Sequence, residues 1–320
     1  NMSEMFASKS PCPSGAFQNG GQPLDWDDGF RGQANMNLMF YRSDFNKDIS
    51  AWNTTNVKDM SRMFESSKFN NGGVAMCWND GFTSNATMEK MFYDNDFINV
   101  DLSCWDTSNV INMMSMFEFA GNFNNGGVAL NWDDGFGVNA NLSRMFRETG
   151  YSFNQDISDW DVSSVTDMSY MFNYATSFNQ DISGWDVSSV TDMAYMFNGS
   201  SSLNQDLSNW DISNVTDMDG IFGGNTGLSA INQCTIHEAW SYNAVWPYNW
   251  ECMSIAHVEN NYVILEDDDL RNELASLQIE LQRGLKEAFI LNGSGNIELR
   301  GERSYLFDFE KPDEKKIKND

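Results

Sequence analysis

The sequence predicts an α/β repeat protein, a solenoid in which short strands and short helical turns stack around one continuous core. Near-identical segments begin every 25 residues at Phe153, Phe178 and Leu203, and a fixed offset is the mark of a repeat architecture. These copies share a central Trp and a closing Met-Phe or Ile-Phe pair. A unit of this length cannot bury its own apolar residues, so neighbouring units must share a core.

Two repeat variants alternate in the first half of the chain. One reads FNKDISAWNTTNVKDMSRMF from Phe45 and recurs as FINVDLSCWDTSNVINMMSMF from Phe97. The other has a glycine-rich start, as in FNNGGVAMCWNDGFTSNATMEKMF. With the truncated copy at residues 1–6, the closing pair occurs nine times up to Phe222, which predicts about nine rungs. The glycine-rich variant begins at Phe17, Phe69 and Phe123, and the central tryptophans are Trp26, Trp52, Trp78, Trp105, Trp132, Trp160, Trp185 and Trp210.

Within one repeat, the segment FNQDIS is expected to be extended, and Asn-Asn-Gly-Gly in the second variant is expected to be a turn. The second half, DVSSVTDMAYMF, places Val190, Met193 and Met196 or Phe197 at spacings of three and four. That spacing favours one or two helical turns with an apolar side facing inward, and Asp186 and Ser188 can cap them. The Trp, Met and Phe stripes are therefore expected to be core.

Composition excludes several classes of partner. The net charge is −27, and residues 1–254 carry 10 basic and 31 acidic residues, a balance of −21. Such a surface repels nucleic acid and anionic lipid. No apolar run is long enough to span a membrane, so no membrane insertion is expected. With 14% aromatic residues the chain is too apolar to remain disordered.

Recurring aspartates are the main candidates for chemistry. Stacked carboxylates about 5 Å apart repel each other, and either bound calcium or turn amides would relieve the repulsion. No contiguous calcium-binding loop is present, so no metal site and no cofactor are predicted. Acids that recur in every rung describe scaffold, and neither His237 nor His257 lies beside a nucleophile, so we expect no enzymatic activity. The aspartates are Asp156, Asp181, Asp206, Asp161, Asp186, Asp211, Asp167, Asp192 and Asp217.

Seven N-glycosylation sequons occur in this Asn- and Ser-rich chain. Many sequons arise by chance in such a composition. Asn198, followed by Gly and Ser in an expected turn between rungs, is the best acceptor if the host glycosylates the chain.

The repeats resemble the BspA-type leucine-rich repeats, in the branch once catalogued as a domain of unknown function in mycoplasma surface lipoproteins, marine bacteria, algae and their viruses. The pattern F-N-x-D-[IL]-S-x-W-D-[VTI]-S-x-V-x-x-M-x-x-M-F is matched closely by residues 153–172, 178–197 and 203–222, and loosely by the glycine-rich copies. Residues 228–250 resemble the closing cap of that family, with a W-P-Y-x-W signature. The resemblance implies a right-handed leucine-rich-repeat solenoid without enzymatic activity.

The end of the chain departs from that family. A helix is expected from Asp268 to Phe289, where acidic residues precede evenly spaced leucines. ILNGSGNIELRG then predicts a β-hairpin, followed by a charged tail. The helix either packs on the end of the solenoid or docks on a partner chain. The expected domains are a solenoid of about nine rungs at residues 1–227, a cap at 228–254 and a helix-hairpin-tail extension at 255–320.

The resemblance implies an exposed or secreted protein concerned with adhesion and recognition, located outside the cell or on a cell or virion surface. Two functions stay open. The first is a recognition module that binds a protein or glycan through the outward residues of the solenoid face. The second is a structural subunit of an extracellular or virion assembly, docked through the extension. The side chains expected to face a ligand are Gln155, Gln180, Gln205, Ser158, Ser183 and Ser208.

Two disulfide bonds are predicted from the position of five cysteines. Cys77 and Cys104 each directly precede a central Trp, so they occupy the same slot in consecutive rungs, about 5 Å apart. Cys234 and Cys252 flank the expected cap, and a bond there would tie its helix to the following segment. Cys12 is left over. The alternative is isolated buried thiols, whereas bonded pairs would place the protein in an oxidising compartment.

Overall fold

The chain divides into two compact units, Asn1–Trp250 and Glu251–Asp320. The first contains all the repeats, and the predicted three-part division of the chain stays a prediction. The computed structural model describes residues 1–7, 30, 32–78, 81–224, 227–250 and 252, and the backbone of six strands between 257 and 319.

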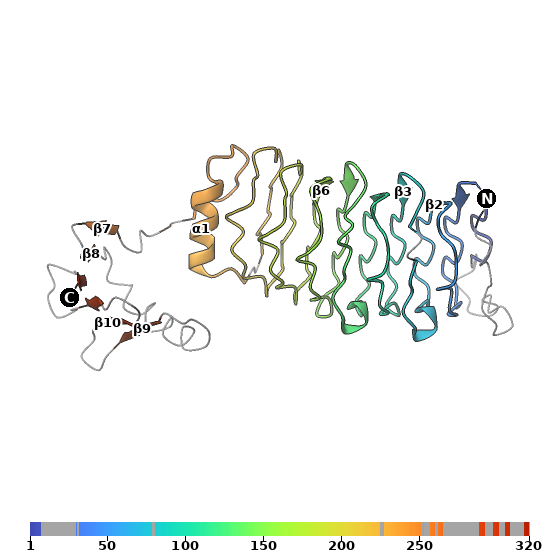
Figure 1. Cartoon of the computed structure of the whole chain (residues 1–320), viewed down its shortest axis with the longest axis horizontal. Helices are drawn as coiled ribbons and strands as arrows, with labels where there is room; N and C mark the ends of the chain where they lie inside the picture. The colour runs from blue at the N-terminus through green and yellow to red at the C-terminus, as the bar shows by residue number, and fades with distance from the viewer. Residues whose placement is uncertain are drawn as a thin grey trace. The chain divides into compact units, whose positions relative to one another are not determined.

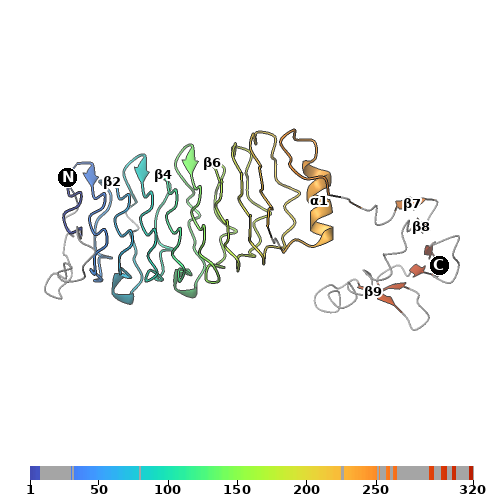
Figure 2. The same ribbon diagram turned by 180° about the vertical axis from the view of Figure 1, so that it is seen from behind.

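The repeats of the first unit form one parallel sheet of six short strands in chain order. Figures 1 and 2 show successive rungs lying side by side from β2 to α1. Parallel bridges continue the ladder from Asp167 to Asp192 and from Asp192 to Asp217. This arrangement is that of a repeat protein of α/β type with few helices. The strands are β1 (Ala34–Asn35), β2 (Val57–Asp59), β3 (Ala86–Thr87), β4 (Val110–Asn112), β5 (Ala140–Asn141) and β6 (Val165–Asp167).

The strands lie in the second half of each repeat, which corrects the expected order of elements. In the described residues the FNQDIS segment forms no strand, and the V-x-D segment does. Two consecutive turns follow it in place of the expected helical turns. Tyr170 and Tyr174 have φ of 58° and 56° within these turns, and this left-handed backbone cannot continue a helix. The Asn-Asn-Gly-Gly turns are confirmed as the short 3-10 segments η2 (Asn71–Gly73) and η3 (Asn125–Gly127).

The two repeat variants fit one ladder through a regular bulge. In the first variant, two residues separate the strand valine from the next buried methionine. In the second variant, only one residue separates the strand alanine from the next buried methionine or leucine. Val57 pairs with Ala34, but Asp59 pairs with Asn35, so the register shifts within the pair. The same shift recurs between β3 and β4 and between β5 and β6. The extra residue is thereby absorbed in the backbone, and the methionines on both sides stay buried.

The central tryptophans stack in one column, which confirms the predicted register. Ring centroids of successive members are 5.0–6.3 Å apart and nearly parallel. Each indole N–H from Trp78 to Trp210 donates to a backbone carbonyl of the preceding rung at 2.6–3.1 Å. Trp26 lies outside the described residues. The Trp column consists of Trp52, Trp78, Trp105, Trp132, Trp160, Trp185, Trp210 and Trp240.

The closing phenylalanines form a second column beside the tryptophans, with Phe172 and Trp185 ring centroids 6.4 Å apart. Successive Phe rings are 5.3–5.8 Å apart. The methionines of the closing segment, such as Met193 and Met196, are fully buried, as predicted. Methionine fills irregular gaps, which suits rungs of unequal length. The Phe column consists of Phe6, Phe40, Phe64, Phe92, Phe117, Phe146, Phe172, Phe197 and Phe222.

An asparagine ladder runs along the opening edge of the rungs. The side-chain Oδ1 of each asparagine accepts the backbone N–H at the same slot of the next rung, at 2.8–3.3 Å. The ladder also corrects the alignment of the copy expected to begin with Phe97. Phe97 is 51% exposed, whereas Ile98 is buried and Asn99 joins the ladder. The opening anchor of that copy is therefore Ile98. The ladder consists of Asn46, Asn70, Asn99, Asn124, Asn154, Asn179 and Asn204.

Helix α1 (Ala230–Trp240) closes the stack. Ser229 caps its first turn by accepting the N–H of Asn232, and Trp240 ends the Trp column with its indole N–H unpaired. Beyond the helix, the Tyr248 hydroxyl accepts the N–H of Phe222 at 2.9 Å. In earlier rungs that N–H donates to a carbonyl of the following rung. Tyr248 therefore replaces the missing next rung.

The second unit contains two antiparallel sheets. Strands β9 and β10 pair directly, which confirms the predicted hairpin, and β12 forms within the expected charged tail by pairing with β11. The expected helix lies outside the described residues, except that its last two residues belong to β9. The strands are β7 (His257–Glu259), β8 (Tyr262–Ile264), β9 (Ala288–Leu291), β10 (Ile297–Arg300), β11 (Tyr305–Phe307) and β12 (Ile317–Asn319).

The Trp column leads to a stability prediction. Trp185→Ala in the full chain removes a ring stacked on both sides and should lower the free energy of unfolding by about 3–5 kcal/mol. Trp185→Phe keeps a stacked ring and loses the hydrogen bond to the Ile157 carbonyl, so its cost should be clearly smaller. Urea denaturation of both variants measures the difference. Equal costs would show that ring packing is not the main contribution.

Candidate recognition surface

All nine recurring aspartates accept the backbone N–H two residues further on, at 2.9–3.0 Å. The turn-amide interpretation of these residues is therefore confirmed. Hydrogen bonds from Ser183 hold the pKa of Asp181 below its usual value. Asp192 behaves in the opposite way, because burial raises the pKa of its carboxyl group. The hydrogen bond from the Ala194 N–H opposes this shift, and the like charges of Asp167 and Asp217 reinforce it. Among the described residues, no three side chains of the His, Cys, Asp and Glu types converge as metal ligands.

The glutamines predicted to face a ligand lie beside the asparagine ladder. Gln180 Nε2 donates to the Asn154 carbonyl at 2.9 Å, and Gln205 Nε2 donates to the Asn179 carbonyl at 3.0 Å. These side-chain amides thus hold one rung to the next. Gln155 occupies the same slot. The backbone amides of Ser158, Ser183 and Ser208 donate to the adjacent aspartates, and the ligand-facing role of all six residues stays a prediction.

A second surface is formed by the two turns that follow the strand in each rung. In each turn the third residue has a positive φ, between 51° and 73°. Up to Gly199 its backbone N–H donates to the next rung, as Tyr170 does to Ala194 at 2.8 Å. We call these positions, together with the residue after each closing Phe, the turn face. Most of its side chains reach the surface, whereas Ser115, Glu118 and Asn173 are buried. Sequence reasoning missed it because it assigned these residues to helical turns.

The turn face carries large side chains where glycine would be the least strained choice. A left-handed backbone costs a residue other than glycine roughly 1–2 kcal/mol, yet fourteen of its seventeen left-handed positions are not glycine. The first turn contributes Glu4, Leu38, Arg62, Lys90, Ser115, Arg144, Tyr170, Tyr195 and Gly220. The second contributes Arg42, Ser66, Asp94, Phe119, Glu148, Tyr174, Gly199 and Gly224.

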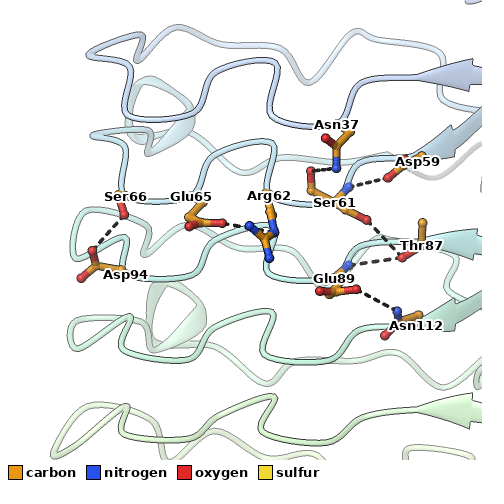
Figure 3. A network of polar contacts seen from close by, with 10 residues as sticks. All are labelled: Asn37, Asp59, Ser61, Arg62, Glu65, Ser66, Thr87, Glu89, Asp94 and Asn112. Atoms are coloured by element: carbon orange, nitrogen blue, oxygen red, sulfur yellow. Dashed lines mark hydrogen bonds and ion pairs between the residues drawn. The ribbon is translucent and has the colours of Figure 1, made fainter. Parts of the chain in front are cut away.

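In the first rungs, polar side chains of the turn face and the adjoining strands satisfy one another (Figure 3). Asn37 Nδ2 donates to the Ser61 carbonyl at 3.1 Å, and Ser66 Oγ donates to Asp94 Oδ2 at 2.9 Å. Arg62 Nε lies 3.7 Å from Glu65 Oε2. Burial raises the pKa of Glu65, and the Arg62 guanidinium opposes this shift. Much of this part of the surface is therefore engaged within the chain, although Arg42 is exposed beside the Tyr41 ring.

Further along, the turn face alternates cations with aromatic rings. The Lys90 ammonium lies 5.4 Å from the centre of the Tyr93 ring, and Arg147 lies 5.4 Å from that of Phe119. Five of the eight basic side chains described in the first unit belong to this face, although the unit is strongly acidic. The five are Arg42, Arg62, Lys90, Arg144 and Arg147.

The predicted Cys77–Cys104 disulfide is present, with the Cα atoms 5.2 Å apart. The Cys234–Cys252 prediction is wrong, because Cys252 carries a free thiol. Cys234 lies on α1, and Cys252 lies beyond Trp250, where the first unit ends. The two cysteines therefore do not flank one compact cap. Cys12 lies outside the described residues.

The remaining site candidates have structural surroundings. Asn198 Oδ1 accepts a hydrogen bond from Asn173 Nδ2 at 3.2 Å, and its own Nδ2 lies against Gly223, which disfavours a glycan on that nitrogen. His237 Nδ1 accepts the indole N–H of Trp246 at 2.9 Å, within the cap. No helix of the described residues is long and apolar enough to cross a bilayer.

The fold and these surfaces define a repeat protein of stacked parallel rungs. A family model described as "Mycoplasma protein of unknown function, DUF285" matches residues 1–79 and 137–257. These stretches make up well over half of the chain, which therefore belongs to the DUF285 family. No curated protein and no solved structure matches the chain.

Two aspartates of one rung should respond to mutation in opposite directions. Asp192→Asn removes a partly buried charge and its repulsion with like charges, and it keeps the acceptor for the Ala194 N–H. At pH 7 it should therefore raise the free energy of unfolding by about 0.5 kcal/mol. The raised folded pKa means that this gain is full at neutral pH and vanishes below about pH 3.9, the unfolded value. Asparagine already occupies this slot at Asn35 and Asn141.

Asp181→Asn is the matched control. Because the folded pKa of Asp181 is lowered, its charge stabilises the fold above the unfolded pKa, and this contribution is lost as the pH falls through the folded pKa. The variant should therefore be destabilised at pH 7 and approach the parent in acid. Thermal melts of both full-length variants between pH 3 and pH 7 measure the effects, and changes of the same sign would contradict the assignment.

The disulfide closes a loop with a sequence separation of 27 residues, and its loss should cost about 3 kcal/mol or less. The variant that combines Cys77→Ala with Cys104→Ala should unfold at the same urea concentration with and without reductant, whereas reductant should destabilise the parent. Mass spectrometry under non-reducing conditions identifies the bond. Equal sensitivity of parent and variant to reductant would show that another bond is responsible.

Proposed function

We propose that this chain is a non-enzymatic recognition module of the BspA-like type, a right-handed leucine-rich-repeat solenoid exposed on a cell or virion surface. It binds a protein or a glycan through the turn face and thereby contributes to adhesion. One observation carries the proposal, the presence of fourteen residues other than glycine at strained left-handed positions that glycine would occupy at lower cost.

Three further observations support this proposal. The rungs repeat the outward positions in register, as expected of an extended binding surface. The Cys77–Cys104 bond fits an oxidising location outside the cytosol. The recurring aspartates accept turn amides and so contribute to the scaffold, in keeping with a non-enzymatic role.

A second function is favoured by the separate compact unit Glu251–Asp320. In this alternative the chain is a structural subunit of an extracellular or virion assembly and docks through its C-terminal extension, including the segment from Asp268 to Phe289. Deleting residues 268–320 separates the two functions. Loss of self-assembly or co-assembly in sedimentation experiments, with ligand binding retained, would favour the structural role. Unchanged assembly would count against it.

The recognition function is tested with two full-length variants. One combines Lys90→Ser with Arg144→Ser, because serine occupies the same position in the rung between them, at Ser115. The other combines Gln155→Ala, Gln180→Ala and Gln205→Ala. Binding to a glycan array and to a phage-displayed library of random peptides should fall in the first variant only. A fall confined to the second would return the binding site to the predicted glutamines, and an absence of binding by the parent would contradict recognition altogether.

A further inference from the structure

The first turns of three successive rungs hold a rigid column of side chains. The Arg144 guanidinium lies 5.1 Å from the centre of the Tyr170 ring, and this ring stacks on Tyr195 at 4.9 Å. Gly220 ends the column, because a Cβ there would lie 2.6 Å from the Tyr195 ring. The rings therefore lose little further conformational entropy when a partner binds.

The neighbouring second turns repeat this design. Tyr174 is 51% exposed and lies against Gly199, where a Cβ would be 2.6 Å from its ring. Asn173 and Asn198 lie beside the two turns. Tyrosine, asparagine and glycine are the residues that protein-binding loops use to combine rigid contact area with adaptable hydrogen bonding. We call Arg144, Tyr170, Tyr174 and Tyr195 the tyrosine patch.

The geometry of the patch favours a protein partner over a sugar. A pyranose ring binds an aromatic side chain by lying on an open ring face. Tyr170 is covered by Arg144 and Tyr195, and Tyr195 is covered by Tyr170 and Gly220, so ring edges and hydroxyl groups are offered instead. The Tyr195 hydroxyl donates to Asp219 Oδ2 at 2.7 Å. Edges and hydroxyls suit the mixed apolar and polar surface of a protein.

Arg144 indicates what the partner carries. The chain has 46 acidic residues, yet among the described residues no carboxylate lies within ion-pair distance of this exposed guanidinium. Arg147 differs, because Glu118 and Glu148 both bind it. A guanidinium held over a ring keeps its N–H edge available, and that edge binds a carboxylate in a bidentate manner.

We infer that the tyrosine patch is the contact centre for a protein segment that presents a carboxylate to Arg144 and packs apolar atoms against the tyrosine edges. This inference rests on the proposed recognition function and names its partner class. Arginine and tyrosine are also the residue types in which binding energy at protein interfaces concentrates.

The experiment uses the full-length chain and a phage-displayed library of random linear peptides. Enriched peptides should contain Asp or Glu next to apolar residues. Arg144→Gln and Tyr170→Ser should each weaken binding about tenfold or more, whereas Tyr151→Ser, at a tyrosine that is 87% exposed outside the patch, should not change it. Replacing the peptide carboxylate by its amide should weaken binding to the parent and have little further effect on Arg144→Gln. Thermal melts verify that each variant is folded.

Three results would overturn the inference. Peptides that bind the parent and all patch variants equally would refute the patch while leaving recognition by another surface intact. Binding confined to a glycan array, and lost in Tyr174→Ser, would change the partner class from protein to sugar. Failure of the parent to bind either library would remove the recognition function together with this inference.

Discussion

The structure depends on the register of one rung on the next, and the tryptophan column fixes that register. Each indole ring stacks on its neighbour, and from Trp78 to Trp210 each indole N–H donates to a carbonyl of the preceding rung. A slip by one residue would break both contacts at once. The strands, of only two or three residues, are too short to specify register by themselves. Packing around the column therefore positions the sheet rather than the reverse.

A fixed register divides the polar side chains into two groups. Those beside the asparagine ladder, such as Gln180 and Gln205, bond rung to rung and belong to the scaffold. Those of the turn face lie in the two turns of each rung, and most of them reach the surface. In the first rungs they bond to one another, whereas from Lys90 to Tyr195 they build alternating cations and rings. Each repeat thus has one edge, beside the asparagine ladder, whose polar groups bond to the next rung. It also has a turn face on which some groups remain available to a partner.

Charge explains why that surface is distinctive. An acidic chain keeps a binding surface open to carboxylates only where its few cations are kept away from its own acids. The ring of Tyr170 does this by holding Arg144 through a cation–π contact. Local attraction then acts against a repulsive overall field. This field disfavours non-specific anions, and under the proposed function it favours a partner that also fits the tyrosine edges.

The sequence alone determined the repeat, the column register, the buried methionines and the Cys77–Cys104 pair, because a constant offset places equivalent residues in adjacent rungs. It could not assign the strand to Val165–Asp167, since spacings of three and four fit a helix as well as a turn pair stabilised by the next rung. Nor could it select Ile98 over Phe97 as an anchor or reject the Cys234–Cys252 bond. These were decided by contacts between rungs and by the end of the first unit at Trp250. The turn face, too, exists only through backbone hydrogen bonds between rungs, which no single repeat contains.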